Sequence, residues 1–175
     1  MKENMGSRGF KAKLEVTTNI MVIAGVLVFG FVVYRSLTNH AKFAPEAPAV
    51  GTVLPALPGY SWDGHSQILL LALRKGCHFC EDSMPFYREL LKAEKGGRSK
   101  AHLVSVVPDG EMDATRLLHD AQLDVPMVAS FQLQRLHVSS TPTLVLVDGN
   151  GSVEKVWVGE QDAAGQQAIL DAIRN

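Results

Sequence analysis

A nineteen-residue stretch without a charged side chain, residues 16–34, limits how this 175-residue chain can fold more than any other feature. As a helix it would be about 28 Å long, close to the hydrocarbon thickness of a bilayer. A surface helix of a soluble domain needs a polar face, and a strand of this length is improbable in a small domain. The stretch therefore predicts an uncleaved membrane anchor, with a cleavable signal peptide and a buried core helix as the alternatives.

The basic residues on either side of this stretch predict its orientation. The four that precede it are Lys2, Arg8, Lys11 and Lys13, and the two that follow it closely are Arg35 and Lys42. Because basic residues accumulate on the cytoplasmic side of a membrane helix, residues 1–15 are expected to form a cytoplasmic tail. The remainder would then face the periplasm or the outside as the exported part of a single-pass protein of the inner (cytoplasmic) membrane.

Composition places one ordinary domain behind this anchor. The chain carries 17 Lys and Arg against 18 Asp and Glu, a net charge of −1, so no basic surplus exists for a nucleic-acid partner. Residues 35–50 are rich in Pro and Ala, which favours an extended linker with little to bury. The folded domain is expected to cover residues 51–175.

Within that domain, strand patterns alternate with helix patterns. Continuous apolar runs predict strands, and apolar residues at helical spacing predict helices. The Asp148-Gly149-Asn150-Gly151 turn predicts a hairpin. The expected strands are 68–73, 102–107, 143–147 and 153–158, and the expected helices are 79–95, 112–122, 128–136 and 163–173. This order predicts an α/β fold with a mixed central sheet flanked by helices.

The two cysteines of the chain, Cys77 and Cys80, lie at the first junction between a predicted strand and a predicted helix. Unpaired backbone N–H groups and the helix dipole favour a thiolate there. Two intervening residues allow both sulfurs to come within bonding range. Cys77, at the exposed edge, is expected to be the nucleophile, and Cys80, one turn deeper, is expected to resolve the mixed disulfide.

A CxxC pair has other interpretations. A structural zinc site needs further ligands, and no second CxxC or His-x-x-x-His is present. Haem attachment needs a His after the second cysteine, but Glu81 is there. A purely structural disulfide would stabilise little, because the closed loop is so short. A copper carrier or metallo-assembly factor, with Cys77, Cys80 and a distant His such as His137 as ligands, remains the alternative from another class.

Four features together resemble the thioredoxin superfamily, and most of all its exported, membrane-anchored thiol-disulfide oxidoreductases of the TlpA/ResA type. A CxxC pair follows an apolar strand, and Pro85 stands where the family's active-site helix carries a kinking proline. Thr141-Pro142-Thr143 precedes a strand as the family's cis-proline loop does, and Val158-Gly159 matches its terminal glycine turn. The resemblance covers about residues 51–175.

The resemblance implies a thioredoxin-like fold and disulfide exchange with exported protein clients and a redox partner protein, with no cofactor or resident metal. It also implies a cis Thr141–Pro142 bond that faces the disulfide, where the backbone of Thr141 would bind a client chain. Within the motif, His78 is expected to tune the Cys77 thiolate, and Phe79 to contribute to client docking or to cap the core.

Two positions depart from the family pattern. Gly76 stands where a tryptophan usually precedes the first cysteine, and Leu71 stands where thioredoxin keeps a buried acid for proton transfer. The general base is therefore unassigned, with Glu81 or a water as candidates. A peroxiredoxin is disfavoured, because its peroxidatic motif is absent from the sequence.

Overall fold

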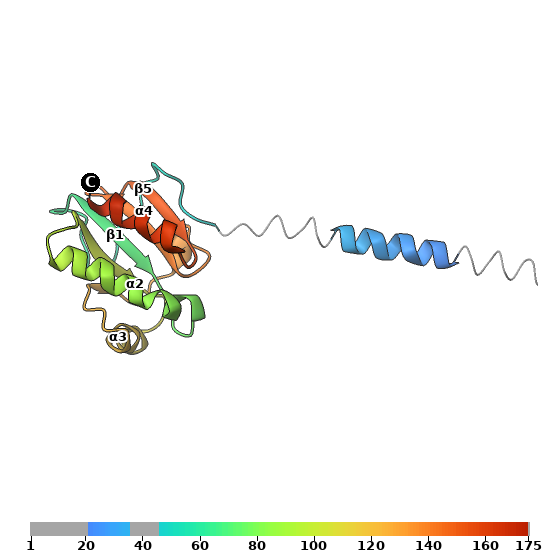
Figure 1. The fold of residues 1–175 in the computed structure, drawn as a ribbon, viewed down its shortest axis with the longest axis horizontal. Helices are drawn as coiled ribbons and strands as arrows, with labels where there is room; N and C mark the ends of the chain where they lie inside the picture. The colour runs from blue at the N-terminus through green and yellow to red at the C-terminus, as the bar shows by residue number, and fades with distance from the viewer. Residues whose placement is uncertain (1–20, 36–45, 175) are drawn as a thin grey trace, which may run out of the picture. The chain divides into compact units, whose positions relative to one another are not determined.

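The computed structural model describes residues 21–35 and 46–174, which belong to two separate units of the chain (Figure 1). Residues 21–35 are helical, and all of their side chains are exposed. In these two described ranges, no helix combines the length and the apolar character needed to cross a membrane. The first five residues of the predicted anchor, 16–20, lie outside the described residues. The predicted tail, residues 1–15, and linker positions 36–45 lie wholly outside them.

The second unit is built on a five-stranded mixed sheet with the strand order β3-β2-β1-β4-β5. β1 lies at the centre, parallel to β2 and antiparallel to β4. β3 is parallel to β2, and β5 is antiparallel to β4. The strands are β1 (Gln67–Ala72), β2 (Ala101–Val106), β3 (Met127–Val128), β4 (Thr143–Asp148) and β5 (Val153–Val158).

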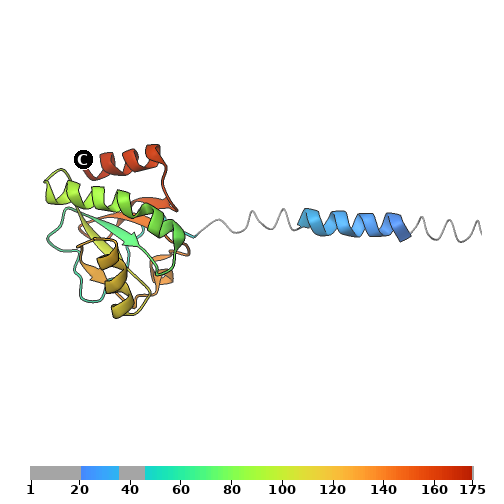
Figure 2. The same cartoon turned by 60° about the horizontal axis from the view of Figure 1, so that its bottom comes forward.

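Three helices cover one face of this sheet, and α2 and α4 lie side by side on it (Figures 1 and 2). The helices are α2 (His78–Lys95), α3 (Glu111–Asp120) and α4 (Ala163–Arg174). Alternate residues of β1 contact them, among them Leu69 and Leu71. The residues between these, such as Ile68 and Leu70, point to the other face. A strand buried on both faces explains the unbroken apolar run in the sequence.

The second face is covered by irregular chain instead of long helices. Leu54 and Leu57, from the segment before β1, pack there together with Phe131 and with the short 3₁₀ helix η1 (Leu133–Leu136). The sequence predicted one short helix over residues 128–136, and only its last four residues, Leu133–Leu136, are helical. Val128 instead belongs to β3 and pairs with Val106, because the edge of β2 offers Val128 backbone hydrogen bonds and a short isolated helix is only marginally stable.

The other strands and helices agree with the sequence prediction to within two residues at each end. The segment before β1 is hydrogen-bonded to the hairpin between β4 and β5. Antiparallel hydrogen bonds join Gly51 to Val153 and Leu54 to Gly151, at 2.8 and 2.9 Å. Pro48 is buried, so residues 46–50, which the sequence analysis assigned to the linker, pack on the domain.

Candidate functional site

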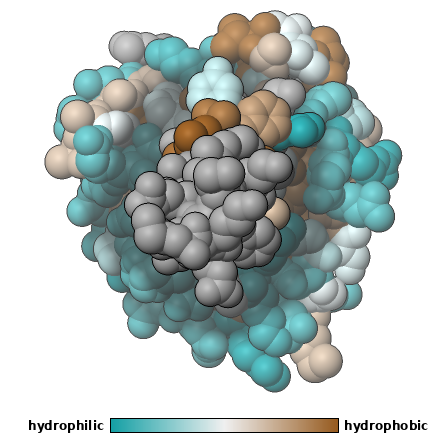
Figure 3. All heavy atoms as spheres, turned by 90° about the vertical axis from the view of Figure 1, so that its right-hand side faces the viewer, coloured by the Kyte–Doolittle hydropathy of each residue, from teal (hydrophilic) through white to brown (hydrophobic). Residues whose placement is uncertain are grey.

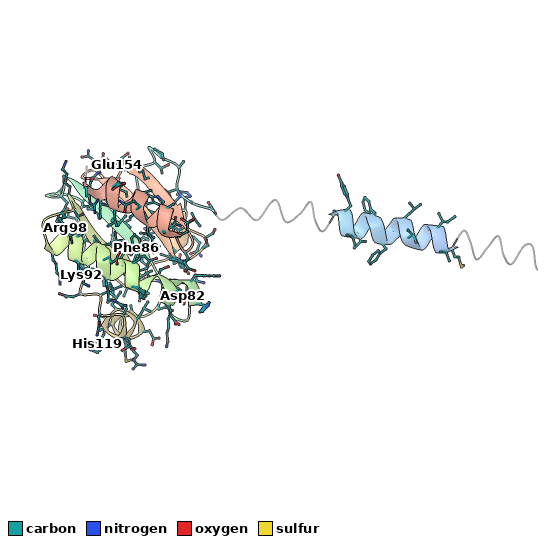
Figure 4. All side chains as sticks on the ribbon, in the orientation of Figure 1. Asp82, Phe86, Lys92, Arg98, His119 and Glu154 are labelled. Atoms are coloured by element: carbon teal, nitrogen blue, oxygen red, sulfur yellow. A yellow bond between two sulfur atoms is a disulfide. The ribbon has the colours of Figure 1, made fainter. Side chains whose placement is uncertain are left out.

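The candidate site begins where the chain leaves β1 and enters α2. Cys77 is the N-cap of α2, with extended backbone angles of φ −89° and ψ 104°. Its Sγ accepts a hydrogen bond from the backbone N–H of Cys80, at 3.2 Å. Asp82 marks this end of the helix in Figure 4, and Phe86 lies one turn further along. An N-cap sulfur in contact with a helix N–H is positioned to hold negative charge.

The two cysteines form a disulfide, with their Cα atoms 5.2 Å apart. They differ sharply in access to solvent: Cys77 is partly exposed, whereas Cys80, in the first turn of α2, is fully buried in the core. An attacking thiolate from another protein can therefore reach the sulfur of Cys77 and not that of Cys80. This asymmetry suits the attacking and resolving roles that the sequence suggested for the pair.

A loop 64 residues further along the chain completes the site. The Thr141–Pro142 peptide bond is cis, as the family resemblance implies. The carbonyl oxygen of Thr141 lies 3.4 Å from the Sγ of Cys77, while Pro142 is buried beneath it. Because neither sulfur of a disulfide carries a proton, this approach is a contact and not a hydrogen bond. The fold thus brings the CxxC motif and the Thr141–Pro142 loop together.

His78 and Phe79 extend from the first turn of α2 into solvent. Phe79 is 57% exposed, so it does not cap the core, and its side chain is accessible to a bound protein. The imidazole Nε2 of His78 lies 3.2 Å from a carboxylate oxygen of Asp82. Asp82 is a site residue that the sequence analysis missed. Its spacing of four residues from His78 on a helix could have indicated the pair.

The described part of the domain holds no fully buried acid. Leu71, which the family resemblance aligns with the buried acid of thioredoxin, is fully buried, and the buried polar residues are Ser83, Ser105 and Thr143. Glu81, the other candidate proton acceptor, is exposed and lines a cavity of about 430 Å³ between α2 and α3. The described domain therefore offers no buried carboxylate to take a proton from Cys80.

Gly76 explains one departure from the family pattern. Its φ of +68° lies in the left-handed region, where a β-carbon is disfavoured. The backbone N–H of the preceding residue, Lys75, donates to the carboxylate of Asp109 at 2.8 Å, which holds the turn. A tryptophan at position 76 would be strained in this conformation, so the glycine follows from the path of the chain.

Tyr87 on α2 and Asp113 on α3 have shifted pKa values. Burial raises the pKa of Tyr87 to about 12, against a smaller opposing effect of the Ser83 hydroxyl. The hydrogen bond from Lys75 holds the pKa of the exposed Asp113 carboxyl below its usual value. Tyr87 is therefore neutral at physiological pH.

No group of three or more His, Cys, Asp or Glu residues is placed to hold a metal ion in ranges 21–35 and 46–174. His137, the third ligand considered for copper, has its Nδ1 3.5 Å from the carboxylate of Glu46. Figure 3 views the molecule from the right-hand side of Figure 1, where the N-terminal end of α2 lies, and most domain side chains seen there are hydrophilic.

No model of a known protein family matches the sequence, and no curated protein sequence matches it either. Solved structures do match the fold. The thioredoxin domain of a thiol-disulfide oxidoreductase from Bacteroides vulgatus superimposes with a TM-score of 0.58 at 20% identity, over 74% of this chain and 100% of that one.

A thiol:disulfide interchange protein from a Bacteroides species has a TM-score of 0.57 at 18% identity, over 73% of this chain and 92% of that one. A protein assigned as a thiol:disulfide interchange protein DsbE from Chlorobium tepidum has a TM-score of 0.54 at 23% identity, over 74% and 97% of the two chains. These similarities confirm the thioredoxin-like fold that the sequence predicted.

Proposed function

We propose that this chain, which has a thioredoxin-like fold, is a thiol-disulfide oxidoreductase that exchanges the Cys77–Cys80 disulfide with protein clients. The observation that carries the proposal is the asymmetry of the pair. A partly exposed N-cap sulfur lies 3.4 Å from the Thr141 carbonyl, and its partner sulfur is fully buried. Solved structures with similar folds include a thiol-disulfide oxidoreductase and a thiol:disulfide interchange protein, which supports the same chemistry.

The exchange proceeds in two thiol-disulfide exchange steps. The Cys77 thiolate attacks one sulfur of a client disulfide, the client S–S bond breaks, and a mixed disulfide forms as one client thiolate leaves. The Cys80 thiolate then attacks the sulfur of Cys77, and the second client thiolate leaves. Two electrons pass to the client, and its two thiolates take up the two protons that Cys77 and Cys80 released. Run in reverse, the same steps oxidise a client dithiol.

The finer parts of the proposal concern where this happens. Residues 16–34 would anchor the protein in the inner membrane, with the domain on the periplasmic or outer side, as the distribution of Lys and Arg favours. The clients would then be exported proteins, and a redox partner protein would restore the cysteine pair after each cycle. An exported location suits a disulfide, which persists outside the reducing cytoplasm.

Turnover with a protein disulfide tests the activity. Reduction of insulin disulfides would be followed in the presence of excess dithiothreitol, with wild type, Cys77→Ser, Cys80→Ser and the surface control His119→Leu. Wild type and the control should turn over, and both cysteine variants should remain at the uncatalysed rate. Wild type at the uncatalysed rate would contradict the proposed function.

A further inference from the structure

The chain that enters the domain is fastened to the loop that carries Thr141. The backbone N–H of Glu46 donates to the Oγ of Ser139 at 2.7 Å, and the backbone N–H of Ser139 donates to the carbonyl of Glu46 at 3.1 Å. The two residues are 93 positions apart in the sequence. We call this pair the Glu46–Ser139 clip.

The clip is supported by a further contact of Glu46 and by the attachment of the segment that follows Glu46 to the domain. The Glu46 carboxylate lies 3.5 Å from Nδ1 of His137, two residues before Ser139. Beyond Glu46, Pro48 is buried, and Gly51 donates a backbone hydrogen bond to Val153 at 2.8 Å. The segment that holds Ser139 is therefore itself attached to the sheet, so it can restrain the loop.

The restrained loop leads directly to the disulfide. Ser139 is two residues from Thr141, whose carbonyl lies 3.4 Å from the sulfur of Cys77. On the far side of the loop, the hydroxyl of Thr143 donates to the carbonyl of Ser140 at 2.8 Å. Thr143 is buried in β4, whereas Glu46 and Ser139 are exposed. The loop is thus held from inside by the sheet and from outside by the clip.

We propose that the Glu46–Ser139 clip positions the Thr141 backbone to bind the client chain, and that Ser139 is a positioning residue for the exchange reaction. This inference rests on the proposed function. A loop held in its binding conformation loses less conformational entropy when the client binds, so the clip should strengthen client binding. The hydroxyl and the backbone N–H of Ser139 bond to Glu46 and not to either sulfur, so the chemical steps at Cys77 and Cys80 should be unaffected.

Ser139→Ala removes the acceptor for the Glu46 N–H, and Ser139→Thr keeps a hydroxyl at the same place. Ser66→Ala is the matched control, because Ser66 is an exposed serine whose hydroxyl donates to a backbone carbonyl, that of Lys100. Kinetics of insulin reduction would give KM and kcat for each variant. The reduction potential and the urea midpoint of unfolding would be measured on the same samples.

We expect Ser139→Ala to raise KM about three- to tenfold, the size that loss of one hydrogen bond gives, with kcat and the reduction potential unchanged. Ser139→Thr and Ser66→Ala should keep the wild-type KM. A purely structural serine would lower the urea midpoint and leave KM unchanged, and this result would overturn the inference while wild-type turnover still supported the proposed function. A wild type without turnover would contradict the proposed function and the clip with it.

Discussion

At the scale of single residues, the site depends on where each charge lies relative to Cys77. The sequence suggested that a protonated His78 stabilises the Cys77 thiolate, and the structure adds Asp82 beside the imidazole, at 3.2 Å. The carboxylate attracts the imidazolium and at the same time repels a thiolate nearby. The two side chains should therefore shift the pKa of the reduced Cys77 thiol in opposite directions.

The first prediction concerns these two substitutions. His78→Leu should raise the pKa of the Cys77 thiol, and Asp82→Asn should lower it, each by less than about one unit, because both side chains are exposed. The absorbance of the thiolate, followed against pH in the reduced protein, measures this. His119→Leu is the control, because the His119 imidazole also pairs with a neighbouring aspartate but lies on α3, not at the disulfide. Shifts of the same sign in both variants would refute the electrostatic account.

The second prediction concerns Tyr87, whose burial raises the pKa of its hydroxyl to about 12. Because the folded pKa lies above the ordinary value of 10, the folded state holds this proton more tightly than the unfolded chain. The resulting stability is complete below pH 10 and is lost as the pH rises towards 12. A shift of two units corresponds to roughly 2–3 kcal/mol of unfolding free energy.

Tyr87→Phe should therefore flatten the loss of stability between pH 10 and 12 in urea unfolding experiments. Tyr60→Phe provides the comparison. The pKa of Tyr60 is also raised, mainly by burial and to a smaller extent by the Glu94 carboxylate, but Tyr60 is less buried than Tyr87. Its effect should be in the same direction and smaller. Equal alkaline loss in wild type and Tyr87→Phe would contradict the assignment.

At the scale of helices and strands, the turn into α2 determines where the nucleophile points. Gly76, at φ +68°, reverses the chain between β1 and the N-cap Cys77. Open space surrounds the position that a β-carbon would take, so only the backbone conformation disfavours a side chain. A substitution there tests the turn without creating a clash.

The third prediction is that Gly76→Ala lowers the free energy of unfolding by about 1–2 kcal/mol, the cost of a left-handed conformation for an L-residue. Gly76→Asn should lose less, because asparagine tolerates this region. Urea midpoints of the three proteins measure the difference. If alanine and asparagine are equally stable, steric strain at position 76 is not what selects glycine.

Much of the element order could be predicted because apolar periodicity marks it. The alternation of Leu69 and Leu71 with Ile68 and Leu70 reflects a strand covered on both faces. The two-residue strand Met127–Val128 could not be predicted, since its hydrogen bonds come from β2, and a local pattern does not encode that partner. For the same reason the sequence did not reveal the Glu46–Ser139 clip, which joins residues 93 positions apart.

The candidate site could be predicted at the residues that carry the family motif, Cys77, Cys80 and Pro142. Their mutual geometry, including the 3.4 Å approach of Thr141 to Cys77, needed the structure. The proton acceptor was left open by the sequence because Leu71 replaces the expected acid. The described residues of the domain include no fully buried acid, so the structure adds no carboxylate candidate to Glu81.

At the scale of the whole molecule, we propose that the redox domain is exported and is held at the membrane by an N-terminal anchor. The fourth prediction is that the intact protein stays in the membrane fraction after carbonate washing, because residues 16–34 carry no charge. Val26→Arg should release part of it into the soluble fraction. Met112→Arg, which replaces an exposed apolar side chain in the domain, should not. A mature product that lacks residues 1 to about 40 would identify a signal peptide instead.

The central claim is that Cys77 attacks clients and Cys80 resolves the mixed disulfide, and trapping tests it most directly. Cys80→Ser removes the resolving thiol, so Cys77 should remain covalently bound to client proteins in cells. The adducts should appear as extra bands on non-reducing gels and disappear after treatment with dithiothreitol. Mass spectrometry should assign the linkage to Cys77. Cys77→Ser should trap nothing, because the sulfur of Cys80 is buried. If Cys80→Ser accumulates no adducts, or Cys77→Ser accumulates as many, the proposed exchange mechanism is contradicted.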